Sequence, residues 1–97
     1  MNPIMQFPSI ASKIIREQEF IIGSLAWDEA RNVEGLKIVD QKKGEVSLED
    51  ADSKNIIDAL VMRYERIFGH ASHEVCRESV RGLIAEMSKE EIPSSLR

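Results

Sequence analysis

His70, His73 and Cys76 stand three residues apart and are the side chains in this chain of 97 residues best suited to chemistry. Imidazole and thiolate are ligands for zinc and copper, and positions three apart can share one face of a helix. Successive steps of three nevertheless rotate around a helix, and a structural zinc site needs four ligands. A metal would therefore need Glu74 from the neighbouring turn, or half-sites pooled by two chains.

We interpret the roles of these three residues as mainly structural. Cys76 is expected in the core, with His70 and His73 as surface or capping groups, so we predict no cofactor and no bound metal. If a metal does bind, these three residues are the candidate ligands. A catalytic role for Cys76 is disfavoured because a thiol within an apolar stripe is usually inert. His73 could reach it as a base, but nothing marks an oxyanion site. Paired-carboxylate, phosphate-loop, dinucleotide-binding and Ser/His/Asp patterns are absent as well, so we do not predict an enzyme.

Four arginines flank Gly69, two on each side. If the flanking helices fold back on each other, these side chains could gather and bind a phosphate or carboxylate. The alternative is ion pairing with nearby glutamates on a solvated face, which we favour. The arginines are Arg63, Arg66, Arg77 and Arg81. Among them, Arg66 and Arg77 join His70 and His73 as candidates for contacting a ligand or partner.

Two amphipathic patterns must position these residues, and they predict helices over 52–68 and 72–88 joined at Gly69. Apolar residues in the first pattern recur every three or four positions from Ile56 to Phe68. Gly69 is suited to ending that helix, and Ser72 to capping the next. Beyond Pro93, the segment 93–97 is expected to be a frayed tail.

The N-terminal sequence predicts an arm over 1–7, where Pro3 and Pro8 disfavour regular structure. It then predicts a long helix over 8–34. Phe20 and Trp27 are seven residues apart and project roughly opposite its main apolar stripe. Either later helices of the same chain cover them, or a symmetric copy does. Gly23 and Ser24 lie between them and could kink or break the helix. Phe20, Gly23 and Trp27 are therefore the interface candidates.

The segment 36–48 predicts a β-hairpin, because apolar and polar residues alternate on both sides of a polar turn ending at Gly44. A lone hairpin is marginally stable, so it must pack on helices or pair with another chain. The stretches Val33–Asp40 and Lys43–Val46 together resemble the first hairpin of roadblock-type regulatory domains. The strands expected after a middle helix in that family are missing here, so no function is carried over from the resemblance.

Composition gives broader limits. The chain is 42% hydrophobic, has a net charge of −4 and contains one cysteine. An acidic excess disfavours nucleic-acid binding, and a single cysteine cannot form an internal disulfide. No apolar run is long enough to span a bilayer, and no secretory signal is recognisable, so we expect no membrane association and a cytoplasmic location.

These observations predict a single domain over 1–97 of the mainly α (α+β) class. Its expected order is a long N-terminal helix, one β-hairpin and two amphipathic helices joined at Gly69. For function we favour a non-catalytic protein-interaction or regulatory module acting as a homodimer. The alternative is a small ligand- or metal-sensing domain that uses the His70, His73 and Cys76 corner or the four arginines.

Overall fold

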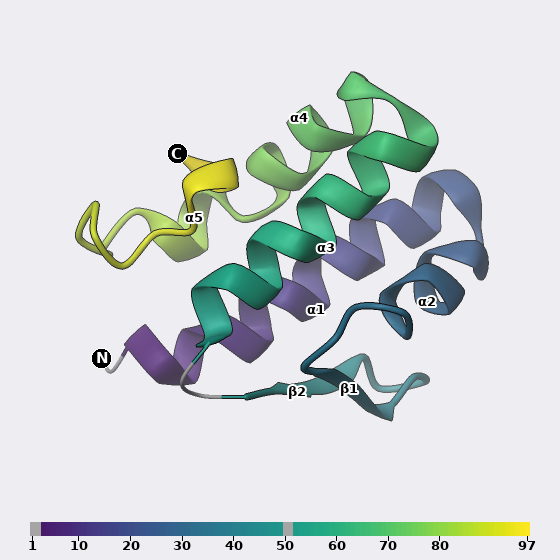
Figure 1. The fold of residues 1–97 in the computed structure, drawn as a ribbon, viewed down its shortest axis with the longest axis horizontal. Helices are drawn as coiled ribbons and strands as arrows, with labels where there is room; N and C mark the ends of the chain where they lie inside the picture. Colours follow the sequence, from purple (N-terminus) through teal and green to yellow (C-terminus); the bar gives the residue numbers. More distant parts are fainter. Residues whose placement is uncertain (1–2, 50–51) are drawn as a thin grey trace.

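The chain is mainly helical and carries one antiparallel β-hairpin, which confirms the predicted fold class (Figure 1). The computed structural model describes residues 3–49 and 52–97; at residues 3–5 only the backbone is described. Within these residues, no helix combines the length and the apolar character needed to cross a membrane. The elements are α1 (Pro3–Ile22), α2 (Leu25–Ala30), β1 (Leu36–Asp40), β2 (Glu45–Leu48), α3 (Ser53–Phe68), α4 (His70–Ser79), α5 (Arg81–Ile84) and the 3-10 turn η2 (Ser94–Leu96).

Helix α3 lies at the centre of the fold and confirms the predicted helix over 52–68. It packs against α1, α2, α4 and η2. Its inward side chains recur every three or four residues, as an amphipathic helix requires. Each contributes about 1.5–3 kcal/mol by leaving water. The buried apolar residues of α3 are Ile56, Ile57, Leu60, Val61 and Tyr64.

The predicted arm over 1–7 is wrong for its described part, because α1 already begins at Pro3. Residues 1 and 2 lie outside the described residues. A proline in a helix forfeits the bond from its own nitrogen to the carbonyl four residues earlier. For Pro8 that loss falls near the helix start, where burial of Phe7 and Ile10 can offset it.

The single helix predicted over 8–34 is also wrong, because α1 ends at Ile22 and α2 begins at Leu25. Gly23 between them has a φ of +70°, a left-handed conformation that interrupts a helix. The break changes the direction of the chain, so the spacing of Phe20 and Trp27 no longer places them on one face. Trp27 is completely buried, whereas Phe20 is 84% exposed.

The hairpin predicted over 36–48 is confirmed, with Leu36 paired to Leu48 and Ile38 to Val46. It packs on α1. The Ser12 hydroxyl donates a hydrogen bond to the Gly44 carbonyl at 2.5 Å, and Arg16 Nη2 donates to the Lys42 carbonyl at 3.0 Å. A two-stranded sheet that is marginal alone is thus supported by a helix.

The predicted helix over 72–88 divides into α4 and α5, and it starts earlier, at His70. The Ser79 hydroxyl donates to the Cys76 carbonyl at 2.8 Å, competing with helical bonding just before the break at Val80.

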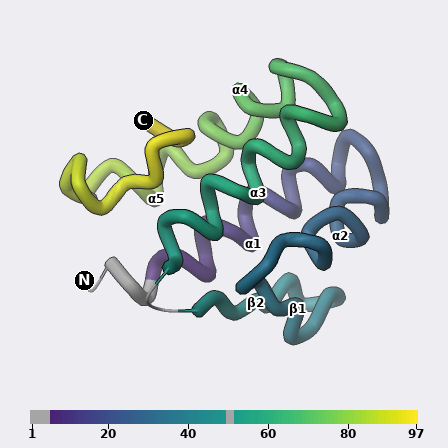
Figure 2. The backbone as a smooth tube through the Cα atoms, viewed as in Figure 1, coloured from purple at the N-terminus to yellow at the C-terminus, as the bar shows by residue number. Residues whose placement is uncertain are grey.

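The frayed tail predicted over 93–97 is wrong as well. Figure 2 shows the terminal segment returning beside α3 and α4, which η2 contacts. Leu96 is 2% exposed, and the Ser95 amide donates to Asp58 Oδ1 at 2.9 Å. Burial of Pro93 and Leu96 and hydrogen bonds from Ser94 and Ser95 to Asp58 hold the segment, features that composition alone does not reveal.

Tyr64→Phe tests how strongly α3 holds α2. The buried Tyr64 hydroxyl donates to the Ala26 carbonyl at 2.7 Å. Its loss should lower the free energy of unfolding by about 1 kcal/mol, measured by urea denaturation. Met62→Ala, at a half-exposed position of the same helix, is the control and should change stability by less than about 0.5 kcal/mol. Equal effects of the two substitutions would contradict a specific role for the hydroxyl.

Candidate functional site

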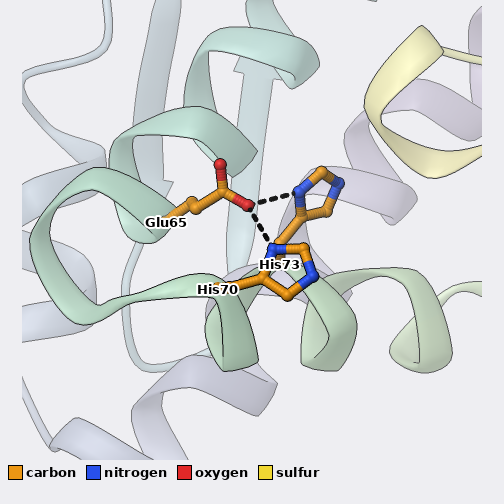
Figure 3. A group of neighbouring side chains, drawn as sticks. All are labelled: Glu65, His70 and His73. Atoms are coloured by element: carbon orange, nitrogen blue, oxygen red, sulfur yellow. Dashed lines mark hydrogen bonds and ion pairs between the residues drawn. The ribbon is translucent and has the colours of Figure 1, made fainter.

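The corner at Gly69 places the end of α3 against the start of α4. Gly69 has a φ of +98° and its amide donates to the Glu65 carbonyl at 2.8 Å, ending α3. Helix α4 begins at the next residue. As a result, Glu65 in the last turn of α3 faces His70 and His73 in the first turn of α4 (Figure 3).

Both imidazole rings converge on one carboxylate oxygen. Glu65 Oε2 lies 3.0 Å from Nδ1 of His70 and 2.7 Å from Nδ1 of His73. The two ring centroids are 5.9 Å apart, in an edge arrangement. Three potential ligand atoms, one from each residue, lie within 4.8 Å of one another. We call Glu65, His70 and His73 the Glu–His cluster.

The C-terminal segment completes the surroundings of His73. Nε2 of this ring lies 2.6 Å from the Ser95 carbonyl oxygen. A carbonyl can only accept, so Nε2 must carry the hydrogen. Ser95 is itself held by Asp58, whose Oδ1 accepts from the Ser95 amide at 2.9 Å and from its hydroxyl at 2.5 Å.

These contacts shift two protonation equilibria. Donation to the Ser95 carbonyl raises the pKa of His73, helped by Glu65 and opposed by partial burial. Hydrogen bonds from His73 and then His70 lower the pKa of Glu65. The side chains of His73 and Glu65 are 19% and 24% exposed, whereas His70 is 77% exposed. The His73–Glu65 pair is therefore the sheltered half of the cluster.

The structure does not bring Cys76 to the two histidines. Its side chain is completely buried, and its sulfur accepts a hydrogen bond from Gln18 Nε2 of α1 at 3.4 Å. Burial raises the pKa of Cys76 to about 11, which keeps the thiol protonated and unreactive. The expectation that Cys76 is a core residue is confirmed. Glu65 takes the third place in the cluster. In the sequence, Glu65 is one of the glutamates near Gly69 expected to pair with arginines, and its spacing from the histidines gives no signal of this role.

The four arginines do not gather at the corner. Arg63 forms an ion pair with Glu29 at 2.8 Å, and Arg77 with Glu74 at 3.3 Å. Arg81 pairs with Glu78 in the same way. Arg63 and Arg66 line one shallow groove, whereas Arg77 and Arg81 line another. Ion pairing with nearby glutamates on a solvated surface, the interpretation favoured from the sequence, describes Arg77 and Arg81. Arg63 instead pairs with Glu29 of α2, and both side chains are largely sheltered from solvent.

A second surface feature lies where α1 meets α2. Phe20 is 84% exposed, Ile21 61% and Leu25 49%. Phe20 and Val39 both line a groove between α1 and the hairpin. Val39, on the hairpin side of this groove, is 59% exposed. We call these four residues the Phe20 face. A side chain at Gly23 would have no atom within 4 Å, so this position faces open space beside the face.

Comparisons with protein-family models, with curated proteins and with solved structures found no match for this chain.

The pKa shifts predict how the His73–Glu65 contact depends on pH. A raised His73 pKa contributes stability below about pH 6.5, which is lost as the pH rises through the folded value. A lowered Glu65 pKa contributes stability above about pH 4.3, which is lost as the pH falls through the folded value. The stability difference between wild type and His73→Gln should therefore be largest near pH 5–6 and shrink towards pH 8, measured by urea denaturation at each pH.

Direct titration of the His73 ring by NMR provides the check. A midpoint below about 6.5 would contradict the predicted direction.

Proposed function

We propose that this protein is a non-catalytic interaction module that pairs with a second copy of itself through the Phe20 face. The supporting observation is the exposure of Phe20 beside Ile21 and Leu25, all within six consecutive residues. Leaving a phenylalanine in water forgoes about 1.5–3 kcal/mol that a partner surface would recover. Clustered apolar side chains at an exposed element junction are typical of association sites.

The charges around the groove favour a copy of the same chain over a strongly charged partner. Lys13 and Arg16 line it together with Glu17 and Glu45, so its charges balance although the whole chain carries −4. A two-fold arrangement presents the same patch on both subunits, and a balanced patch can oppose itself without net repulsion. Lys13 and Glu17 already form an ion pair at 3.2 Å. The frequency of two-fold symmetry also favours a second copy of this chain, because two-fold dimers are the most frequent assemblies of identical chains.

The residues of this chain best suited to catalysis lack the surroundings that would activate them. Cys76 is buried with a raised pKa, and neither histidine lies against a hydroxyl or thiol nucleophile among the hydrogen bonds of the described residues. A nucleophile needs an adjacent base to be activated. A cytoplasmic location remains part of the proposal, since a chain with a single cysteine has no internal disulfide that would require an oxidising compartment.

Phe20→Ser tests the pairing surface. We expect the wild-type protein to sediment as a dimer at tens of micromolar, and Phe20→Ser to shift it to monomer by weakening association at least about tenfold, since burial of the ring is worth more than 1.4 kcal/mol. Sedimentation equilibrium gives the mass, and circular dichroism should show unchanged helix content.

Met62→Ser is the control, because Met62 is another exposed apolar side chain (47%) but lies on α3, outside the Phe20 face. It should leave the dimer intact. A wild-type protein that stays monomeric at about 100 µM, a concentration that would populate a complex of micromolar affinity, would overturn the proposal.

A further inference from the structure

The hydrogen-bond directions at His73 leave two lone pairs facing each other. Because Nε2 donates to the Ser95 carbonyl, the neutral ring presents a bare Nδ1 to Glu65 Oε2 at 2.7 Å. Nitrogen and carboxylate lone pairs repel at this separation unless a positive species lies between them. A proton can fill that role, and so can a metal ion.

His70 adds a third donor aimed at the same point. Its Nδ1 lies 3.0 Å from the same Glu65 oxygen, and Figure 3 shows both rings turned towards the carboxylate. Two imidazoles and one carboxylate form a ligand set used by zinc and by non-haem iron. We propose that Glu65, His70 and His73 of one chain bind a divalent transition-metal ion of the zinc type.

The spacing of the donors suits this assignment. Ligand atoms about 2.0–2.1 Å from a tetrahedral zinc ion are about 3.3–3.4 Å from each other. The 3.0 Å contact of His70 must therefore open by about 0.3–0.4 Å and the 2.7 Å contact of His73 by about 0.6–0.7 Å. His70 is 77% exposed, so its ring has room for the smaller adjustment, whereas the larger one requires the sheltered His73 and Glu65 side chains to move apart. Three protein ligands leave at least one coordination position to water.

A surrounding shell supports the ligands. The Ser95 carbonyl fixes the tautomer of His73 and leaves Nδ1 available, which is the arrangement found around ligating histidines. Asp58 holds Ser95 through two hydrogen bonds, so Asp58 is a positioning residue for the site. On the solvent side, Glu74 Oε1 lies 3.8 Å from Nε2 of His70.

Zinc binding to the full chain at pH 7.5, measured by competition with a chromophoric chelator, tests the proposal. We expect one zinc ion per chain. Glu65→Gln and His73→Ala should each weaken affinity at least about 100-fold, since loss of a ligand costs no less than loss of an outer-shell partner. Glu78→Gln, which changes a carboxylate of α4 paired with Arg81 outside the cluster, should bind zinc as the wild type does.

Cobalt substitution identifies the donor atoms. The Co²⁺ protein should show visible ligand-field bands without the ultraviolet charge-transfer band of a cobalt–thiolate bond, and Cys76→Ala should leave the spectrum unchanged. If His73→Ala disturbs folding, Glu65→Gln carries the test, because it keeps the shape of the side chain and removes its charge.

Asp58→Ala examines the positioning role. It should weaken zinc affinity about tenfold and alter the ring-nitrogen chemical shifts that report the His73 tautomer. Unchanged shifts together with lower affinity would assign Asp58 only a structural effect.

Three results would overturn the metal site. These are equal zinc affinities of wild type and Glu65→Gln, loss of binding in Cys76→Ala, and one zinc per two chains. Phe20→Ser should bind zinc normally, so the metal site and the proposed pairing surface can fail independently.

Discussion

Burial of the apolar stripe of α3 is the interaction on which the rest of the structure depends. The inward residues of this stripe are at most 3% exposed, and α1, α2, α4 and η2 all pack against this helix; the inward residues are Ile56, Ile57, Leu60, Val61 and Tyr64. Tyr64 fixes α2, and Asp58 fixes the C-terminal segment from the same helix. Because α3 also carries Glu65, its packing determines where the Glu–His cluster forms.

Both surface features arise where a left-handed glycine interrupts a helix. Gly23 ends α1 directly after Phe20, Ile21 and Ile22, and Phe20 and Ile21 lie outside the core. Gly69 ends α3 and turns α4 back, so that residues five and eight positions beyond Glu65 approach its carboxylate. A continuous helix would spread these side chains around its circumference. The glycines therefore shape the chemistry of the surface without contributing side chains to it.

The core contains buried polar atoms that lower its stability. Among the described residues, Gln18 Oε1 and Trp27 Nε1 are buried without a hydrogen-bond partner. Each such atom costs about 1–3 kcal/mol, against a total stability of about 5–15 kcal/mol for a typical domain. Association or ion binding by the folded state alone would add to that total. Both proposed interactions are thus consistent with a small chain that has little stability to spare.

The sequence by itself determined the fold class, the hairpin and the helix α3, because each depends on a local period of apolar residues. It also indicated that Cys76 belongs to the core. Only the tertiary structure decided that Trp27 is buried, that Leu96 anchors the C-terminus, and that Glu65 rather than Cys76 joins the histidines. These outcomes depend on the direction of the chain after Gly23 and Gly69 and on contacts between distant segments. Periodicity gives the face of a helix on which a residue lies, but packing between elements decides what that face meets.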